Sequence, residues 1–443
     1  MSSRPIPDVA TQVGAVLAAI AGGRFAGLPI SLAFWDGSAI AAADVELRPA
    51  PTLGVGRRAL AHLLYEPNQL GLTRAFVTGD LRVDGSLEEV LALRHRLGGV
   101  RLSTRELATA ATMAVKLGRL DAVRPPRIPD SEMRPAGRRH SLSRDRATVE
   151  HHYDLSNAFY RRLLGPSLVY SCAYFADPAE SLEVAQQRKL ELICRKLRLT
   201  PAERLLDLGC GWGSLVLHAA AHHDVQAVGI TLSEAQAQLA RERIRDAGLT
   251  DRCEIRVADY REVHDGPYDK IASVGMYEHV GSEQLDGYAE TVARLLRPGG
   301  LMLNHGISRL GSTQGAGEKS LIQRYVFHDG ELQPVADVVA ALERAGLETR
   351  DVESLREHYA LTLRRWLGNL DADHAAVIAD VGVERERVWQ LYMTGSASAF
   401  EDGDITLHQV LAARSGAPHG LDLTRCDPLA ASPVAAAPAA QRS

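Results

Sequence analysis

The clearest pattern of apolar and polar positions lies in the middle of the chain, where short apolar runs alternate with amphipathic segments. The apolar runs have the length of buried strands, and they cover Leu205–Leu208, Gln226–Ile230, Cys253–Val257, Lys270–Val274 and Leu301–His305. The segments between them have helical apolar spacing, and they cover Leu215–Ala221, Ser233–Ala247 and Gln284–Leu296. This alternation predicts an α/β fold with a doubly wound, mainly parallel sheet, whose ligand lies at the carboxyl ends of the strands.

The first 120 residues have a different pattern and predict a separate, small α+β domain. Ile30–Trp35 and Phe76–Val83 have strand-like sequences bounded by turn residues, whereas Leu87–Leu97 and Leu107–Leu120 have helical apolar spacing. Prolines break regular structure in a linker at residues 121–147. A larger domain is expected over residues 148–427, and the Ala/Pro/Ser-rich residues 428–443 predict a disordered tail.

Composition narrows the functional classes. The net charge of −5 over 443 residues gives no global positive field, so no nucleic-acid partner is expected. The five cysteines are scattered without metal-type spacing, which predicts reduced thiols in a cytosolic protein and no metal site. Val13–Ala21 is too short to span a bilayer and lacks the features of a signal peptide. We therefore expect a cytoplasmic protein with at most peripheral membrane contact.

The strongest single motif is the glycine-rich turn RLLDLGCGWG at residues 204–213. Gly209, Gly211 and Gly213 let the backbone turn sharply and let a ligand approach main-chain N–H groups. Asp207 ends the strand and can accept hydrogen bonds from a ligand or from the loop. The pattern D-x-G-x-G-x-G resembles the S-adenosylmethionine (SAM) loop of Rossmann-like methyltransferases. A glycine turn of another α/β protein is the alternative for this motif taken alone.

Further motifs coincide with those of one lipid-modifying family. The matching stretches are HHYDLSNAFY (151–160), YSCAYF (170–175), GITLSEAQ (229–236), SVGMYEHVG (273–281), LNHGIS (303–308), RYVFHDGEL (324–332) and EHYALTLRRW (357–366). Together with the glycine loop, they resemble the cyclopropane fatty acid synthase family, which includes the mycolic acid cyclopropane synthases and related lipid methyltransferases. The resemblance covers about Glu150 to Leu411.

This resemblance implies SAM as the methyl donor and a set of residues that hold it. Tyr260 would give adenine a flat apolar wall, and Asp259 would accept from its exocyclic amine. Thr231 stands where many methyltransferases place an acid for the ribose, but it fits the family's T-L-S-x-x-Q. The implied cofactor-binding residues are Tyr170, Ser171, Asp207, Gly209, Cys210, Gly211, Gly213, Thr231, Leu232, Gln236, Asp259 and Tyr260.

The family's active site also binds bicarbonate, which serves as the general base. The five positions that carry over are Cys172, Glu278, His305, Ile307 and Tyr359. Cys172 and Ile307 would act through backbone groups, and His305 and Tyr359 would donate to the anion. Glu278 would fix the hydrogen-bonded set and accept the bicarbonate proton.

The implied reaction passes through a carbocation, because the SAM sulfonium alkylates a cis alkene in an acyl chain. Water must be excluded from this cation, and desolvated aromatic faces stabilise it by up to about 2 kcal/mol each. Tyr277, Phe175, Tyr174 and Trp366 are the candidates. Direct proton loss closes a cyclopropane ring, whereas a prior hydride shift leads to a methylene branch.

Two segments favour the methylene product, which is a precursor of tuberculostearic acid. Gly395–Phe400 reads GSASAF where many cyclopropane synthases have a cysteine in a segment like A-C-A-E-A-F. The GEL of RYVFHDGEL also resembles the methylene branch of the family. A cyclopropane-fatty-acyl-phospholipid synthase is the alternative, followed by a methyltransferase of small molecules or nucleic acids and an inactive lipid-binding protein.

The expected partners are unsaturated phospholipid acyl chains at the inner membrane face, a reductase acting on the methylene product, and further copies of this chain. AFVTGDLRVDGSLEEVLAL at residues 75–93 resembles a lipid-binding domain similar to sterol carrier proteins, but a structural or dimerising role stays open. The arginine-rich linker is either a solvated connector or a segment attracted to anionic head groups.

Overall fold

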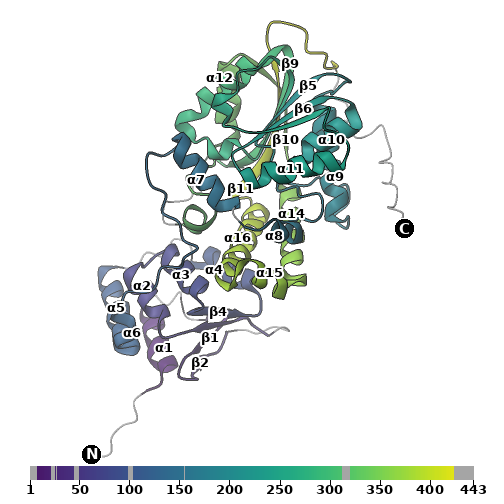
Figure 1. Ribbon diagram of the computed structural model, residues 1–443. Helices are drawn as coiled ribbons and strands as arrows, with labels where there is room; N and C mark the ends of the chain where they lie inside the picture. The colour runs from purple at the N-terminus through teal and green to yellow at the C-terminus, as the bar shows by residue number, and fades with distance from the viewer. Residues whose placement is uncertain are drawn as a thin grey trace, which may run out of the picture.

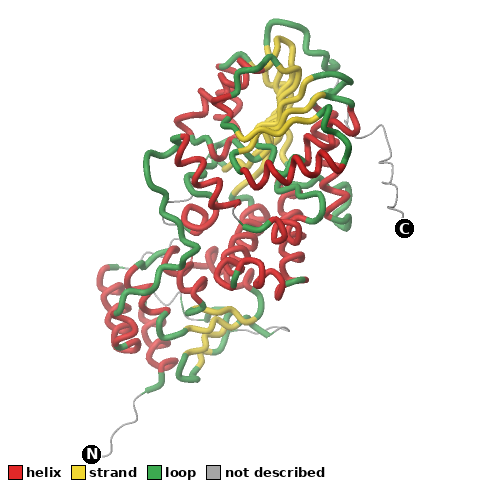
Figure 2. The backbone as a smooth tube through the Cα atoms, viewed as in Figure 1, coloured by secondary structure: helices red, strands yellow, loops and turns green. Residues whose placement is uncertain are grey.

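The computed structural model describes residues 7–20, 25, 27–43, 49–97, 103–153, 155–311 and 320–423, and the expected disordered tail lies outside these ranges. The described chain forms a smaller N-terminal unit and a larger unit placed end to end (Figure 1). Helices form most of the region where the two units meet, and the large sheet lies at the opposite end (Figure 2).

The larger unit contains a seven-stranded sheet with the order β10-β11-β9-β8-β5-β6-β7. Its strands are β5 (Arg204–Leu208), β6 (Gln226–Thr231), β7 (Cys253–Val257), β8 (Tyr268–Val274), β9 (Leu296–Arg309), β10 (Leu347–Ser354) and β11 (Ile405–Arg414). Strands β5 to β9 run parallel, whereas β11 is antiparallel to β9 and to β10. The predicted doubly wound, mainly parallel sheet is confirmed, and the antiparallel edge is an addition to it.

Helices cover both faces of this sheet (Figure 1). One core cluster joins the sheet to α9 (Leu182–Lys196), α10 (Ser214–His223) and α11 (Glu234–Asp246), and another joins it to α12 (Leu285–Leu295) and α13 (Val335–Arg344). Successive residues of β5 alternate between them, because Leu205 belongs to the first cluster and Leu206 to the second. Burial on both faces explains why the strands read as nearly continuous apolar runs.

A helical layer separates the sheet from the N-terminal unit (Figure 2). It consists of α7 (Leu142–Tyr153), α8 (Asn157–Leu164), α14 (Arg356–Ala372), α15 (His374–Val381), α16 (Val383–Asp402) and a π-helical turn at Ile322–Val326. A third core cluster fills this layer and contains both Cys172 and Tyr359. Two residues expected at the active site therefore belong to this layer rather than to the sheet.

The N-terminal unit has a four-stranded sheet with the order β2-β1-β3-β4. Its elements are α1 (Val9–Ala19), β1 (Ser31–Phe34), β2 (Ala39–Ile40), β3 (Thr52–Val55), α2 (Ala59–Tyr65), α3 (Gln69–Thr78), β4 (Leu81–Asp84), α4 (Leu87–Leu97), α5 (Thr104–Gly118) and α6 (Leu120–Val123). The predicted strand Phe76–Val83 is wrong in its first half, which belongs to α3. Asn68 caps this helix and Gly79 ends it in a left-handed conformation, so the strand begins only at Leu81.

The segment between α6 and α7 is anchored to both units. Arg74 of the N-terminal unit donates two hydrogen bonds to the fully buried carboxylate of Glu132, at 2.6 and 2.7 Å. Tyr325 of the π-helical turn donates to the same carboxylate at 3.1 Å. Arg127, Arg134 and Arg139 of this segment pair with acidic groups, as does Arg144 in the first turn of α7. Among the described residues, no helix has the length and apolar content that crossing a bilayer requires.

Candidate active site

A cavity of about 170 Å³ lies at the carboxyl ends of β5 and β6. The implied cofactor residues that line it are Tyr170, Ser171, Asp207, Gly209, Cys210, Gly211, Thr231, Leu232, Gln236, Asp259 and Tyr260. Parallel strands end at the same edge of a sheet, so residues scattered over 90 positions meet here.

Gly213 is the implied cofactor residue that does not line this cavity. It precedes α10 with φ of 76°, and a Cβ there would lie 3.1 Å from the Cβ of Ala240. This glycine therefore allows α10 to pack closely on α11. Gly209 and Gly211 also have positive φ, of 78° and 54°, and both line the cavity.

A buried pair of opposite charges lies in the wall of this cavity. Burial raises the pKa of Asp207 to about 7, and its Oδ1 has no hydrogen-bond partner. Burial lowers the pKa of Lys189 to about 8, and the Lys189 ammonium donates to Ser171 Oγ at 2.9 Å. Each charge favours the ionised form of the other. The pair thus offers a zwitterionic ligand both an acceptor and a cation.

The remaining polar wall is held by internal hydrogen bonds. Thr231 Oγ1 donates to Gln236 Oε1 at 2.8 Å. Asp259 accepts hydrogen bonds from the guanidinium of Arg261 on both of its oxygens, each at 2.7 Å, and it caps the turn that carries Tyr260. The Asp259 carboxylate is therefore fixed in place at the edge of the cavity.

A second cavity, of about 1230 Å³, lies between the sheet edge, the helical layer and the N-terminal unit. All five implied catalytic residues line it: Cys172, Glu278, His305, Ile307 and Tyr359. Tyr170, Ser171, Gly275 and His279 line both cavities, so the two adjoin. Its volume exceeds the roughly 300–1,000 Å³ of a typical small-ligand pocket.

Glu278 carries one unpaired oxygen at this cavity. Its Oε1 accepts a hydrogen bond from the backbone N–H of Ile307 at 2.7 Å, while its buried Oε2 has no hydrogen-bond partner. Burial raises the pKa of Glu278 to about 7. A carboxyl group with this pKa can exchange a proton near neutral pH.

His305 carries the other unpaired polar atom. Gln409 Nε2 donates to His305 Nδ1 at 3.1 Å, which leaves the ring proton on the buried Nε2, an atom without a partner. Burial holds the pKa of His305 well below its usual range. The ring is therefore a neutral hydrogen-bond donor directed by Gln409.

The other implied catalytic residues contribute in different ways. The Cys172 thiol donates to the backbone oxygen of Ala173 at 3.1 Å, and burial raises its pKa, so it is not a thiolate nucleophile. The N–H of Ile307 is engaged by Glu278, so Ile307 orients this carboxylate instead of offering a free donor. The ring of Tyr359 packs 4.7 Å from that of Phe400.

The aromatic lining of the large cavity differs from the expectation. Tyr277, Phe175, Tyr174 and Trp366 are not among the residues that line it. The Tyr277 hydroxyl instead donates to the backbone oxygen of Ile307 at 2.5 Å beneath the site. The aromatic residues that do line the cavity are Phe76, Tyr170, Phe327, Tyr359, Tyr392 and Phe400.

Lys189 and Gln409 are site residues that the sequence analysis missed. Lys189 is a polar position on the buried side of α9, and Gln409 is a fully buried polar residue within the apolar strand β11. A charged or amide side chain inside an apolar pattern is the signal that could have identified them.

The chain is similar to several known lipid-modifying proteins. The sequence profile described as mycolic acid cyclopropane synthetase matches residues 140–410. A probable fatty acid methyltransferase of Pseudomonas putida is 39% identical over 408 residues, which are 90% of this chain and 96% of that protein. The cyclopropane-fatty-acyl-phospholipid synthase of Escherichia coli (strain K12) is 37% identical over 290 residues, which are 64% of this chain and 72% of that protein.

Two further relatives extend the comparison. The tuberculostearic acid methyltransferase UfaA1 of Mycobacterium tuberculosis is 32% identical over 408 residues, which are 88% of this chain and 89% of that protein. A crystal structure of the mycolic acid cyclopropane synthase CmaA1 complexed with SAH and CTAB has a TM-score of 0.58 and 34% identity, and the match covers 61% of this chain and 98% of that chain.

Proposed function

Because this chain belongs to the mycolic acid cyclopropane synthetase family of SAM-dependent methyltransferases, we propose that it transfers a one-carbon unit from SAM to the cis double bond of an unsaturated phospholipid acyl chain. One observation carries the proposal. Glu278 Oε2 and His305 Nε2 are buried polar atoms without partners, and both residues line a large cavity that adjoins the SAM cavity.

The chain's own residues prepare the binding of SAM. Asp207 accepts from the ammonium of the methionine part, and Lys189 pairs with its carboxylate. Both groups are buried, and a zwitterion would give each of them a further partner of opposite charge. SAM supplies an electrophilic methyl group when it is bound, and Tyr170 and Ser171 line both cavities at the place where this methyl meets the acyl chain.

The large cavity protects a cation on the acyl chain. Apolar side chains from three layers exclude water, and the aromatic faces of Tyr170, Tyr359 and Phe400 line the cavity. In the balanced reaction, the sulfur–methyl bond breaks, a carbon–carbon bond forms on the alkene, and a proton leaves the new one-carbon unit. A base must receive this proton, and Glu278 is a buried carboxyl group that lines the cavity.

Bicarbonate, the family's base, fits the two unpaired atoms. When bound, bicarbonate would serve as the general base in place of a side chain. Ionised Glu278 would accept from its hydroxyl group, and the neutral His305 Nε2–H would donate to one of its oxygens. The Ile307 amide and Gln409 hold these two side chains in position.

For the product, we favour a methylene-branched acyl chain. The two sequence segments that favour this product both line the large cavity. The lining residues are Gly395, Ser396, Ala399 and Phe400 in the first segment, and Gly330, Glu331 and Leu332 in the second. Small residues in α16 let the acyl chain lie farther from the base, which gives a hydride time to migrate before deprotonation. The second candidate is a cyclopropane ring, favoured by the names of the E. coli relative and of the solved synthase.

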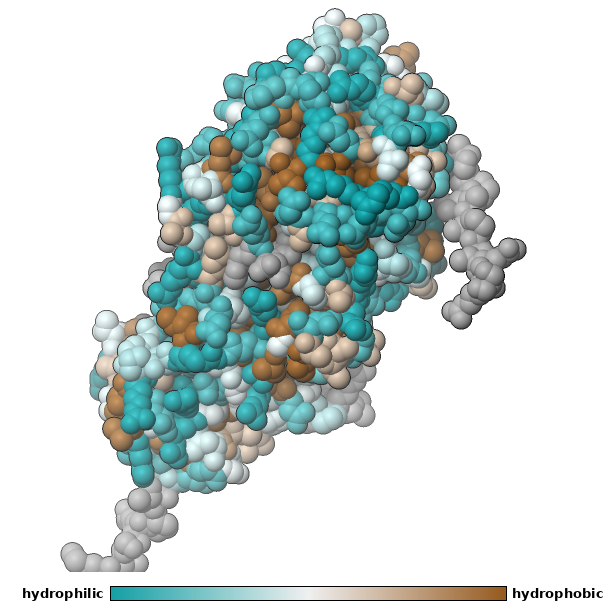
Figure 3. All heavy atoms as spheres, viewed as in Figure 1, coloured by the Kyte–Doolittle hydropathy of each residue, from teal (hydrophilic) through white to brown (hydrophobic). Residues whose placement is uncertain are grey.

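The N-terminal unit contributes to acyl-chain binding and to membrane contact. Leu53, Leu72, Phe76 and Leu91 are among its residues that line the large cavity. Exposed apolar side chains lie on α5 and α6, namely Leu107, Val115, Leu120 and Val123. Figure 3 shows brown side chains on that flank of the unit. We propose that this flank contacts the inner membrane face or a further copy of the chain, and that a reductase saturates the methylene product.

The test uses the purified full chain with SAM and vesicles of dioleoyl phospholipid. We expect mass spectrometry to detect acyl chains that have gained one CH₂ unit, and Glu278→Gln to abolish this gain. Proton NMR then distinguishes the products, because a methylene branch gives terminal alkene signals and a cyclopropane gives upfield ring protons. Unmodified lipid in the presence of bound SAM would contradict the proposed reaction, and ring protons as the main signal would contradict the proposed product.

A further inference from the structure

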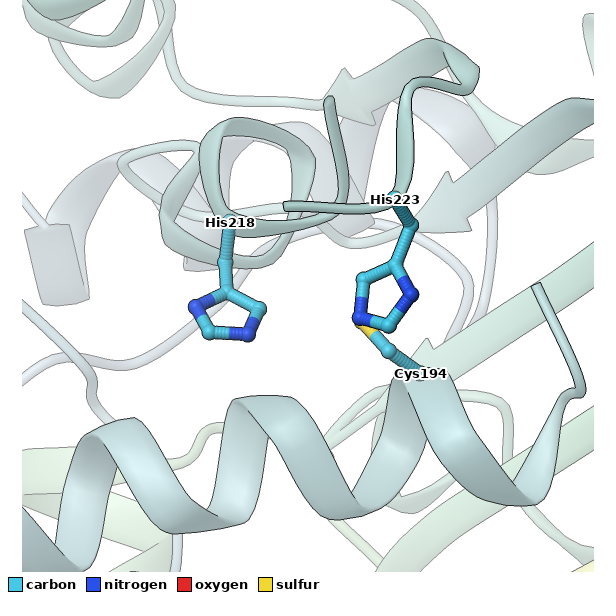
Figure 4. Close-up of side chains that lie close together, drawn as sticks. All are labelled: Cys194, His218 and His223. Atoms are coloured by element: carbon cyan, nitrogen blue, oxygen red, sulfur yellow. The ribbon is translucent and has the colours of Figure 1, made fainter. Parts of the chain in front are cut away.

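A cluster of metal-ligating side chains lies between α9 and α10, and its members line neither cavity. Cys194 Sγ and one ring nitrogen each of His218 and His223 lie within 4.8 Å of one another. Figure 4 shows both imidazole rings extending from α10 toward α9, with the Cys194 side chain next to the ring of His223. The cluster therefore joins two helices that cover the same face of the sheet.

Glu191 lies beside the cluster and brings a carboxylate oxygen close to both imidazoles. Its Oε2 lies 3.1 Å from Nε2 of His218 and also 3.1 Å from Nε2 of His223. Bonds of about 2.0–2.1 Å to a tetrahedral ion would separate such ligand atoms by about 3.3 Å. Both imidazoles thus converge on one oxygen at nearly the spacing that a shared ion requires.

We propose that Glu191, Cys194, His218 and His223 form a structural zinc site. The combination of one thiolate, two imidazoles and one carboxylate suits Zn²⁺ better than Mg²⁺ or Ca²⁺, which prefer oxygen ligands alone. The thiolate and the carboxylate balance the charge of the dication. The other oxygen of Glu191 accepts a hydrogen bond from Arg195 at 2.5 Å, which orients the carboxylate as an outer partner.

Zn²⁺ binding would change the protonation of its ligands, because each ligand atom must be free of a proton. Cys194 has its thiol proton, because burial raises its pKa, and it must lose this proton to become a ligand. Each imidazole would bind through a ring nitrogen that carries no proton. Binding therefore releases the thiol proton of Cys194. The partly exposed side chains of Glu191 and His223 provide the path of entry, whereas Cys194 is fully buried.

The ion would stabilise the fold rather than take part in the reaction. It would link α9, which carries Lys189, to α10, which begins directly after the glycine loop. His218 lies in the middle of α10 and His223 at its end, and this helix of 10 residues is about 15 Å long. The ligands form two short pairs, Glu191 with Cys194 and His218 with His223, and 24 positions separate Cys194 from His218, so the sequence alone does not show that the pairs meet.

The test uses the full chain, first treated with a chelator and then titrated with Co²⁺ or Zn²⁺ alone. We expect one ion per chain, a thiolate-to-cobalt charge-transfer band, and proton release on Zn²⁺ binding in calorimetry. The band should disappear in Cys194→Ser. The Zn²⁺ affinity should fall at least about 10- to 100-fold in His218→Gln and in His223→Gln, because loss of an outer partner alone costs that much.

A matched control comes from the same helix. The exposed ring of His222 lies 4.6 Å from that of His218 but is not part of the cluster, so His222→Gln should retain the wild-type affinity. Binding of S-adenosylhomocysteine (SAH) verifies that each variant is folded. Absence of the charge-transfer band in the folded wild-type chain would overturn the proposal. Equal Zn²⁺ affinity in the wild type and Cys194→Ser would also overturn it, and the cluster would then be a hydrogen-bonded set only.

Discussion

Replacing Lys189 by methionine tests whether its charge binds the carboxylate of SAM. The substitution retains most of the side-chain length and removes the ammonium group from the cavity wall. Burial lowers the pKa of Lys189 from 10.5 to about 8, which corresponds to about 3 kcal/mol of unfavourable free energy for the charged form without ligand. A ligand carboxylate that pairs with this charge recovers part of that cost.

The expected loss of affinity follows from this buried environment. A hydrogen bond to a charged group contributes about 1.5–3 kcal/mol, and each 1.4 kcal/mol changes a dissociation constant tenfold. Lys189→Met should therefore weaken binding of SAH by about 10- to 100-fold in isothermal titration calorimetry. SAH has the same methionine-derived carboxylate as SAM and is not consumed during the measurement.

The pH dependence provides an independent readout. Below a pH of about 7, Asp207 is protonated and does not hold the ligand ammonium, whereas above a pH of about 8, Lys189 loses its charge. The affinity of the wild type should thus be highest between these values. In Lys189→Met the decrease on the alkaline side should disappear, while the decrease on the acidic side remains.

A lysine of the same helix serves as the control. Lys196 is also buried, pairs with Asp351 and Glu353, and does not line the SAM cavity. Lys196→Met should lower the melting temperature but leave the affinity for SAH unchanged. If Lys189→Met is folded and binds SAH as tightly as the wild type, the proposed pairing with the carboxylate is refuted.

Three further predictions concern turnover and the substrate. Glu278→Gln should bind SAH normally but lose about 10²- to 10⁴-fold in turnover. Wild-type turnover should increase as the pH rises through about 7, and the variant should lack this increase. A wild-type rate that is flat across this range would contradict the role of Glu278. Leu91→Asp places a charge in the wall of the large cavity and should reduce methylation of lipid vesicles without changing the affinity for SAH. Leu107→Asp, on the exposed flank, should retain full activity toward a detergent-solubilised lipid substrate. Gly395→Val should narrow the cavity at α16 and increase the fraction of cyclopropane measured by NMR; an unchanged product ratio would remove this segment from product control.

The sheet and the glycine loop could be predicted because their signals are local. An apolar run followed by glycines identifies β5 and the loop, and the motifs after β6, β7 and β8 share the same edge of the sheet. Phe76 lies in a segment that resembles a strand in its apolar content, but Asn68 and Gly79 cap a helix around it. Asn68 lies before the predicted strand and Gly79 lies inside it, and neither residue is apolar, so the pattern of apolar positions alone led to the wrong element.

The parts of the site that escaped prediction depend on partners far away in the sequence. Ser171 lies 18 positions from Lys189, and Gln409 lies 104 positions from His305. Neither pair forms a local sequence motif. The role of a single polar side chain can be recognised only when the fold buries it beside its hydrogen-bond partner. Tyr277 was expected to face the substrate, but it follows β8 in a tight turn that directs its ring beneath Gly306.

The large cavity explains why an α+β unit precedes the methyltransferase domain in this chain. The solved mycolic acid cyclopropane synthase is matched over 98% of its own length by only 61% of this chain, so the match leaves a large part of this chain without a counterpart there. In this chain Leu53 of β3, Phe76 of α3 and Leu91 of α4 line the cavity that contains Glu278 and His305. The α4 helix is held against the helical layer by Arg364, which binds Glu88 at 2.5 and 2.7 Å. Residues of both units thus line the cavity, and we expect the position of the N-terminal unit to influence which acyl chains reach Glu278.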